Sequence, residues 1–482
     1  MTPRRPPNVL LIVADDHAAH AVSAYGSTIN RTPGIDRLAR EGMRFDACYC
    51  TNSLCTPSRA VILTGTYNHV NGVYTLHTPF DARQPTFVSA LHDAGYATAI
   101  VGKWHLGHGG IHDPHGFDHW EVLPDQGDYW DPEFLTRSGR RRRPGYATDV
   151  ITDLATDWLD SRDRTRPFCL LVHHKAPHRS WEYDPAHAHL YPDGSVPVPA
   201  TYDDDYAHRA QAARAARMRI REDLRAEDLK EPVPAGLDPA EEAAWRYQRF
   251  IADYLRCVAS LDDNVARLLD HLDAEGLSGD TVVVYTSDQG FFLGDHGWFD
   301  KRFMYEESAR MPLLVRYPPL VAPGSHTDAL VVNVDFAQTL LELAGVGAHP
   351  RMQGRSLVPL LAGRRPPDWR TAIYYRYWEH DDGIHHVWAH YGVRTDRYKL
   401  VCYYGDGLGL PGTSQRVMPP EWELFDLDDD PHELRSVYDD PRYADVRAQL
   451  HATLTALQDE VGDHPYRPAH RPVTDTEGRP AR

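Results

Sequence analysis

The pattern of apolar and polar residues predicts an α/β protein. Residues 8–14 form one continuous apolar run, which is typical of a strand buried on both faces of a sheet. Further strands are predicted at residues 98–101, 168–172 and 281–286, and helices at residues 35–39, 87–94 and 247–273. Because strands and helices alternate along the chain, we expect a large, mostly parallel sheet flanked by helices.

The pattern changes near residues 363–367, where Gly363 and two prolines interrupt it. Four short strand-like segments follow, and then one helix; they lie at residues 372–377, 390–394, 398–404, 423–426 and 443–460. We therefore predict a catalytic domain over residues 1–365 and a smaller α+β subdomain with an antiparallel sheet over residues 366–465. The end of the chain, residues 466–482, is rich in Pro, Arg and Thr and is expected to be a loose tail.

Two stretches of the first domain are predicted to lie outside its core. Residues 124–147 contain four consecutive arginines, Arg140 to Arg143, and are expected to form a solvated loop because charge runs usually face water. Residues 184–245 mix Pro, Tyr, His and charged residues. We expect them to form a long surface excursion that shapes a substrate cleft, with a helix over residues 207–221.

Charge limits the classes of partner. The chain of 482 residues has 69 acidic and 51 basic residues, and its formal net charge is −18. A protein with this overall field is not expected to bind nucleic acid, and it repels anionic substrates at long range. Any anion-binding site must therefore be locally basic.

The cysteines and the start of the chain bear on location. Six cysteines are too few for a disulfide framework in a chain of this length, and no stretch approaches the ~18 apolar residues of a membrane span. Arg4-Arg5 resembles part of a twin-arginine signal, but the apolar run that follows is short and leads into Asp15. A soluble cytoplasmic enzyme without membrane partners is the expectation.

Two predicted strands end in oxygen-bearing side chains. Asp15-Asp16 follows the first strand, and Asp288-Gln289 follows the strand at 281–286. Adjacent carboxylates are costly unless a cation neutralises them, and an all-oxygen ligand set suits a hard cation such as Ca²⁺. A turn or a helix cap is the alternative interpretation of each pair alone.

Cys55 lies in the run Cys55-Thr56-Pro57-Ser58-Arg59, which precedes an apolar helical segment. A buried structural thiol is one interpretation. A cysteine nucleophile is another, because a helix N-terminus lowers the pKa of a thiol.

This run resembles the sequence motif of type I sulfatases, which belong to the alkaline phosphatase superfamily. The resemblance extends to Asp15-Asp16, to Gly102-Lys103-Trp104-His105-Leu106-Gly107, to Thr286-Ser287-Asp288-Gln289-Gly290 and to Asp300-Lys301. It implies the fold of that superfamily and the oxidation of Cys55 to Cα-formylglycine by a formylglycine-generating enzyme. The hydrated aldehyde is a nucleophile, and its second hydroxyl lets the sulfate leave without attack by water.

The resemblance also implies roles for single residues. Asp15, Asp16, Asp288 and Gln289 would bind Ca²⁺, which the oxidised residue 55 would also touch; most relatives have Asn or His where this chain has Gln289. Arg59 would hold the diol, and Lys103 and Lys301 would bind the sulfate oxygens. His105 would serve the nucleophile. His178, which follows the buried strand at 168–172, would face the leaving group.

Several segments resemble a narrower group, the bacterial N-acetylglucosamine-6-sulfatases and mucin-desulfating sulfatases. They are residues 126–129, 173–179, 253–260, 290–301 and 390–394. A sulfated saccharide is the substrate that this resemblance implies, and a short imported one fits the predicted location. His390 is a candidate sugar ligand, with a core position in its strand as the alternative.

Two other functions are compatible with the fold. A phosphonate monoester or phosphodiester hydrolase of the same superfamily would share the modified residue and the metal. Asp16, Lys103 and His105 favour sulfate over that alternative. A non-catalytic binding protein would be expected to have lost a ligand or a cation, and none is missing.

Overall fold

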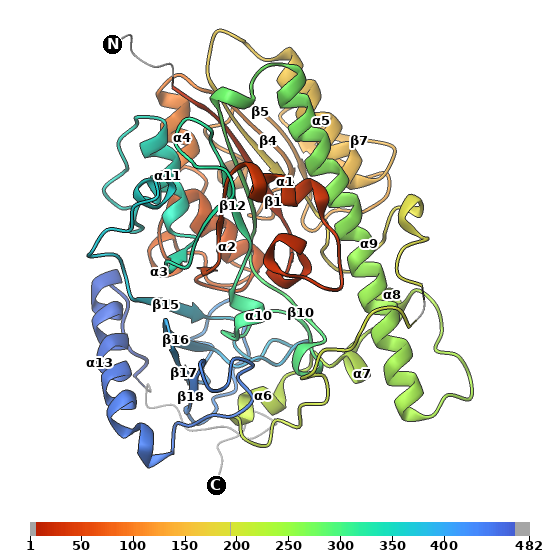
Figure 1. Ribbon diagram of the computed structural model, residues 1–482, viewed down its shortest axis with the longest axis vertical. Helices are drawn as coiled ribbons and strands as arrows, with labels where there is room; N and C mark the ends of the chain where they lie inside the picture. Colours follow the sequence, from red (N-terminus) through yellow and green to blue (C-terminus); the bar gives the residue numbers. More distant parts are fainter. Residues whose placement is uncertain (1–5, 193, 468–482) are drawn as a thin grey trace.

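A ten-stranded mixed sheet forms the centre of the protein in the computed structural model, which describes residues 6–192 and 194–467 (Figure 1). In sheet order the strands are β13 (Ser325–Thr327), β2 (Met43–Phe45), β12 (Leu313–Arg316), β9 (Thr281–Ser287), β1 (Asn8–Ala14), β8 (Phe168–His173), β4 (Ala97–Lys103), β5 (His119–Leu123), β6 (Glu133–Thr136) and β7 (Gly139–Arg142). The five central strands from β9 to β5 run parallel. The predicted α/β class and its mostly parallel sheet are thus confirmed.

Helices cover both faces of this sheet, as Figure 1 shows. One layer contains α1 (Pro33–Glu41), α5 (Ala147–Ser161) and α9 (Pro239–Ala274), and the other contains α2 (Cys55–Thr64), α4 (Phe87–Asp93) and α11 (Asp335–Leu343). Alternate residues of β1 face the two layers: Leu10 and Ile12 pack in the core with α1, α5 and α9, whereas Leu11 and Val13 pack with α2, α4 and α11. Burial on both faces explains why β1 is apolar throughout.

A second, antiparallel sheet follows in the chain. It consists of β15 (Ala372–Tyr377), β16 (His390–Thr395), β17 (Tyr398–Tyr403) and β18 (Glu421–Asp426), with α13 (Ala444–Val461) packed against it (Figure 1). The predicted C-terminal sheet and helix are confirmed. Phe303, Tyr375 and Tyr403 belong to one hydrophobic cluster that continues from the large sheet into the small one. The boundary at residues 365 and 366 stays a prediction.

Short elements connect these layers. They are β3 (Cys48–Tyr49) paired with β14 (Val331–Val332), β10 (Phe292–Leu293) paired with β11 (Phe299–Asp300), and the helices α3 (Asn68–Asn71), α6 (Gln211–Ala215), α7 (Ile220–Asp223), α8 (Ala226–Leu229), α10 (Glu306–Ala309) and α12 (Val358–Leu361).

The prediction that residues 124–147 form only a loop is wrong. Strands β6 and β7 lie within this stretch and extend the large sheet beyond β5. Arg140, Arg141 and Arg142 are exposed, as expected, but their backbone forms the edge strand of the sheet. Arg143 is only half-buried and pairs with Glu121 at 2.8 Å. The run of charged residues correctly predicted that these side chains face water. It did not show that their backbone pairs with β6.

The predicted helix at residues 207–221 is also wrong. Only α6 and α7 are helical there, and Ala216 between them is extended. The backbone N–H of Arg217 donates instead to the carbonyl of His385 (2.7 Å), and Arg219 forms a β-bridge with Trp298. Contacts with distant segments thus replace the local helical hydrogen bonds that the alanine-rich sequence favours.

Helix α9 begins at Pro239, earlier than the predicted start at residue 247. Asp238 accepts hydrogen bonds from the N–H groups of Ala240 and Glu241, and the side chain of Glu241 accepts one from the N–H of Asp238, which completes a capping box. Proline occupies the first helical position. This is a helix-start pattern that the apolar periodicity alone does not show.

Within residues 6–192 and 194–467, no helix is both long and apolar enough to cross a membrane. Most of the predicted tail, residues 468–482, lies outside the described residues.

Candidate active site

The carboxyl ends of the central parallel strands meet at one edge of the large sheet. Asp15-Asp16 follows β1, Lys103 ends β4, residues 174–178 follow β8, and Asp288-Gln289 follows β9. Neighbouring parallel strands deliver their end residues to one place, as is general in open α/β sheets. The close approach of β4 and β8 requires Gly102, which has φ +96°; a Cβ there would lie 2.0 Å from the carbonyl oxygen of His173.

Cys55 is the first residue of α2, and no side chain caps the N-terminus of this helix. Its free N–H groups and the helix dipole favour negative charge beside residue 55. The Cys55 thiol is buried and lies 4.0 Å from Asp16 Oδ1. Burial and the Asp15 carboxylate raise the pKa of this thiol well above its ordinary value. The interpretation of unmodified Cys55 as a low-pKa nucleophile is therefore not supported.

Three buried carboxylates form an acidic cluster beside Cys55. Oxygen atoms of Asp15, Asp16 and Asp288 all lie within 4.8 Å of one another. Burial raises the pKa of Asp16 to about 6 and that of Asp288 to about 7, and the neighbouring Asp15 carboxylate adds to both shifts. Burial also acts to raise the pKa of Asp15, but Lys103, His178 and Arg59 outweigh it and hold the pKa well below its ordinary value.

This cluster fits a divalent cation. Asp15 Oδ1 and Gln289 Oε1 are both buried, and neither has a hydrogen-bond partner within the described residues. Buried acceptors without partners are rare in folded proteins, and a cation would satisfy them. The ligand atoms of Asp15, Cys55 and His178 also lie within 4.8 Å of one another, so residue 55 would lie beside such an ion.

Three buried cations surround the carboxylates. Arg59 donates through Nε to Asp288 Oδ2 at 2.9 Å and through Nη1 to the carbonyl of Lys103 at 3.0 Å. Lys103 forms an ion pair with Asp15, and Lys301 Nζ lies 2.7 Å from Asp16 Oδ2. Burial lowers the pKa of Lys301, but the Asp16 carboxylate and its neighbours outweigh it and raise that pKa, so Lys301 stays charged.

Two histidines complete the group. His105 has φ +52° and lies beside Thr56, whose hydroxyl donates to the carbonyl of His105 at 2.9 Å. Burial and Lys103 lower the pKa of His105, so that its imidazole is neutral at neutral pH. His178 Nε2 lies 3.7 Å from Asp16 Oδ2, and Nδ1 donates to the carbonyl of Arg179 at 2.6 Å. The structure thus gathers around Cys55 every predicted site residue of the first domain.

His390 lies elsewhere. It is fully buried on β16, its Nδ1 donates to the carbonyl of Trp388 at 2.8 Å, and four aromatic rings surround it: Phe303, Tyr375, Tyr377 and Tyr403. His390 therefore occupies a core position in its strand, which was the alternative to its role as a sugar ligand. It is not one of the residues grouped around Cys55.

The sequence did not single out four residues that contact the site. His173 Nδ1 lies 3.2 Å from Arg59 Nη1. Gln126, Tyr129 and Lys175 approach Lys103 and His178 from the turn after β5 and from the segment after β8. The family-like segments 126–129 and 173–179 contain all four residues, but nothing in their local pattern indicates these contacts.

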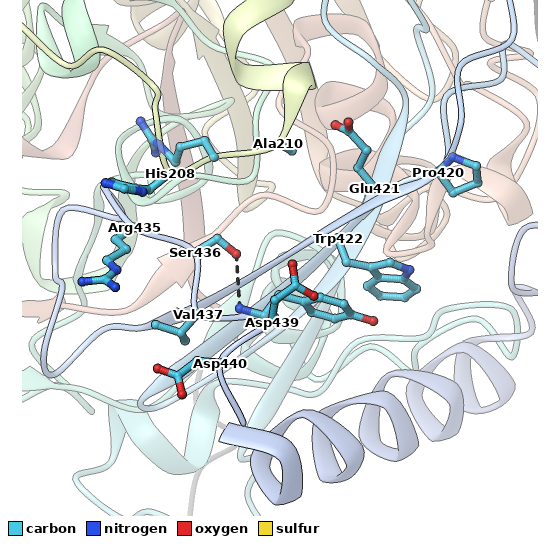
Figure 2. Close-up of a pocket in the computed structure, with 12 residues that line it drawn as sticks. His208, Ala210, Pro420, Glu421, Trp422, Arg435, Ser436, Val437, Asp439 and Asp440 are labelled. Atoms are coloured by element: carbon cyan, nitrogen blue, oxygen red, sulfur yellow. Dashed lines mark hydrogen bonds between the residues drawn. The ribbon is translucent and has the colours of Figure 1, made fainter. Parts of the chain in front are cut away.

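One cavity of the described residues lies away from this site. A cavity of ≈ 740 Å³ lies between the segment His208–Ala210, the start of β18 and the loop Arg435–Asp440, as Figure 2 shows. None of its lining residues belongs to the group around Cys55.

Comparison with protein families gives two matches. The family described as "Sulfatase" matches residues 7–346, and the family described as "N-sulphoglucosamine sulphohydrolase, C-terminal" matches residues 294–460. An N-acetylglucosamine-6-O-sulfatase from Bacteroides thetaiotaomicron is 41% identical over 95% of this chain and 87% of its own length. The human N-acetylglucosamine-6-sulfatase is 29% identical over 77% of this chain and 67% of its own length.

Two solved structures show how far the fold is shared. The structure of BT4656 in complex with its substrate D-glucosamine-2-N,6-O-disulfate superposes with a TM-score of 0.88 and 40% identity, covering 95% of this chain and 98% of that one. The phosphonate monoester hydrolase of Agrobacterium radiobacter has a TM-score of 0.72 at 21% identity, covering 94% and 96%. The second likeness shows a common fold alone.

Proposed function

Since this chain belongs to the sulfatase family, we propose that it hydrolyses the 6-O-sulfate ester of a glucosamine-type sugar, with oxidised Cys55 as the nucleophile. The observation that carries the proposal is the position of Cys55 at the open N-terminus of α2, with buried carboxylates on one side and buried cations around them. The substrates named for the Bacteroides relative and for the BT4656 complex support the choice of sugar.

Two groups that the structure does not contain would supply part of the chemistry. Formylglycine at residue 55, made by a formylglycine-generating enzyme, would add water to form a diol, and one hydroxyl of that diol would be the nucleophile for sulfur. Ca²⁺, held by Asp15, Asp16, Asp288 and Gln289, would act as the Lewis acid beside that hydroxyl.

Lys103, Lys301 and Arg59 stabilise charge on the sulfate. All three are buried, so their charges act in a site from which water is largely excluded. Fixed cations of this kind stabilise a transition state more than a mobile solvent does, because they need no reorganisation as charge shifts between the ester oxygens. The net charge of −18 repels anions at long range, so a sulfate needs a locally basic site. These three residues form such a site.

The two histidines have opposite proton roles in this proposal. His105 is neutral, so it can accept a proton from the hydroxyl group at residue 55. His178 donates through Nδ1 to Arg179, so the proton for the leaving alcohol must come from Nε2 of the imidazolium. Burial lowers the pKa of His178, and the negative charge of a bound sulfate acts in the opposite direction and favours the protonated form.

The proposal is tested by sulfate release from defined sugars. Protein co-expressed with a formylglycine-generating enzyme is incubated with N-acetylglucosamine-6-sulfate, N-acetylglucosamine-3-sulfate and a phenylphosphonate ester, and mass spectrometry of the peptide that contains residue 55 reports its oxidation. We expect sulfate release from the 6-sulfate only. Faster turnover of the phosphonate ester, or full activity with an unmodified thiol, would overturn the proposal.

Replacing His178 with glutamine is expected to affect poor leaving groups most. A sugar alkoxide needs a proton as it departs, so kcat/KM for the sugar sulfate should fall by about 10²-fold or more. Nitrophenolate leaves without such help, so kcat/KM for nitrophenyl sulfate should change little. Equal losses on both substrates would assign His178 to sulfate binding rather than proton transfer.

A further inference from the structure

Lys175 is a buried lysine without a counter-ion. The residue is 4% exposed, and its ammonium forms no ion pair within the described residues; the carboxylates of Asp15, Glu182 and Asp128 act on it from a longer range. Its two contacts are the carbonyl of Gln126 at 3.3 Å and the face of the Tyr129 ring, with Nζ 4.7 Å from the ring centroid. Burial and the charge of Lys103 lower the pKa of Lys175 to about 8. An ammonium in this setting destabilises the fold, which suggests that it is kept for function.

Gln126 joins this lysine to the lysine of the site. Its side-chain oxygen Oε1 accepts a hydrogen bond from Lys103 Nζ (2.5 Å), and its backbone carbonyl accepts the one from Lys175. The residue lies in a tight turn after β5, closed by the N–H of Gly127 donating to the carbonyl of Pro124 at 2.8 Å. Gly127 has φ +67°, and a Cβ there would lie 2.8 Å from Leu123 Cδ1, so the turn is fixed by local geometry.

The same turn reaches the leaving-group side of the site. The Tyr129 hydroxyl donates to the carbonyl of His178 at 2.7 Å, while the Tyr129 ring supports the ammonium of Lys175. The N–H of His178 in turn donates to the carbonyl of Lys175 at 3.0 Å. The turn therefore touches Lys103 directly and holds the backbone of His178.

The ammonium of Lys103 has three N–H donors. Asp15 accepts one and Gln126 accepts the second, and within the described residues no acceptor contacts the third. Two fixed acceptors determine the direction of the remaining N–H. Without Gln126 the ammonium could rotate about its bond to the side chain, and its free donors would lose their orientation.

We propose that Gln126 and Lys175 are positioning residues for sulfate binding: Gln126 orients the ammonium of Lys103 so that its remaining N–H meets a sulfate oxygen, and Lys175 anchors Gln126. The inference rests on the proposed function, since it takes the ligand to be a sulfate ester. It assigns a role in sulfate binding to a turn that contributes no group to nucleophilic attack or proton transfer.

The test compares Gln126→Met, which keeps the length of the side chain but removes the acceptor, with Gln126→Glu. Steady-state kinetics on the sugar sulfate are combined with inhibition by inorganic sulfate, which reports binding without chemistry. For Gln126→Met we expect KM and the inhibition constant of sulfate to rise about tenfold, with a smaller change in kcat. Gln126→Glu should raise both further, because its carboxylate repels the anion. Gln248→Met is the matched control, since the side chain of Gln248 bonds to the backbone of Val196, which lies outside the site.

Lys175 is tested by Lys175→Met and Lys175→Arg. Methionine removes the buried charge, so sulfate affinity should fall several-fold while the melting temperature stays equal or rises. Arginine can donate to the Gln126 carbonyl and stack on Tyr129, and should restore most of the affinity. A residue with a purely structural role would instead lose melting temperature in Lys175→Met and leave the inhibition constant of sulfate unchanged.

The two proposals can fail separately. Absence of sulfate release from any sugar sulfate by the wild-type protein would defeat the proposed function. Calorimetric binding of inorganic sulfate that is equal in wild-type protein and Gln126→Met would defeat the positioning role, whatever the enzymatic result.

Discussion

Replacing Cys55 with alanine is expected to abolish sulfate ester hydrolysis. The substitution removes the thiol whose oxidation would give formylglycine, so the hydrated aldehyde cannot form beside the acidic cluster and the lysines. Loss of a nucleophile of this kind lowers kcat by about 10⁴-fold or more. The measurement is sulfate release by wild-type and variant protein, both produced with the generating enzyme.

The control for this variant is Cys402→Ala. Cys402 is also buried, but it lies on β17 of the small sheet, away from the group around residue 55. It should keep wild-type kcat, apart from a stability loss common to small core truncations. Cys55→Ala should keep its melting temperature and should still bind Ca²⁺ through Asp15, Asp16, Asp288 and Gln289. Residual activity of one tenth of wild type would mean that another residue is the nucleophile.

Asp288→Asn is expected to have the second-largest effect, because it removes one ligand charge from the cation site and one partner of Arg59. Cation affinity should fall, and kcat/KM should drop by about 10³-fold, since both the Lewis acid and the geometry of Arg59 are disturbed. Calorimetric titration with Ca²⁺ measures the first effect directly.

Thermal unfolding gives an independent readout of the same site. Ligands that bind only the folded state raise the melting temperature, so wild-type protein should be stabilised by Ca²⁺ and destabilised by a chelator. Asp288→Asn should show little response to either. Asp439→Asn, which changes an exposed carboxylate beside the cavity of Figure 2, should respond like wild type. An unaltered Ca²⁺ response in Asp288→Asn would remove Asp288 from the ligand set.

Local patterns were sufficient for the class of fold and for most of the site. The apolar run of β1 and the strands β8 and β9 are visible in the sequence because burial on both faces favours apolar residues at most positions. The run from Cys55 to Arg59, whose members are neighbours at the start of α2, singled out residue 55 through its resemblance to the sulfatase motif. The strand ends then place the acidic pairs at one edge by the general geometry of parallel sheets.

The tertiary structure decided what depends on contacts between distant segments. The helix expected at residues 207–221 is broken because its backbone bonds to His385 and Trp298. His390 was a candidate ligand by position in its strand, and aromatic packing places it in the core.

The sequence by itself thus determined the α/β fold, because strands buried on both faces are apolar along most of their length. The resemblance of its motifs to those of sulfatases singled out Cys55 and the carboxylates, cations and histidines proposed to act with it. Only the tertiary structure showed that Gln126 bonds to both Lys103 and Lys175. These three residues lie at or after the ends of three different strands, β4, β5 and β8, which the sheet brings together. Hydrogen bonds between segments separated by tens of residues produce no periodic pattern in the sequence. The residues that position Lys103 therefore could not be predicted, whereas the residues proposed to act in the reaction could.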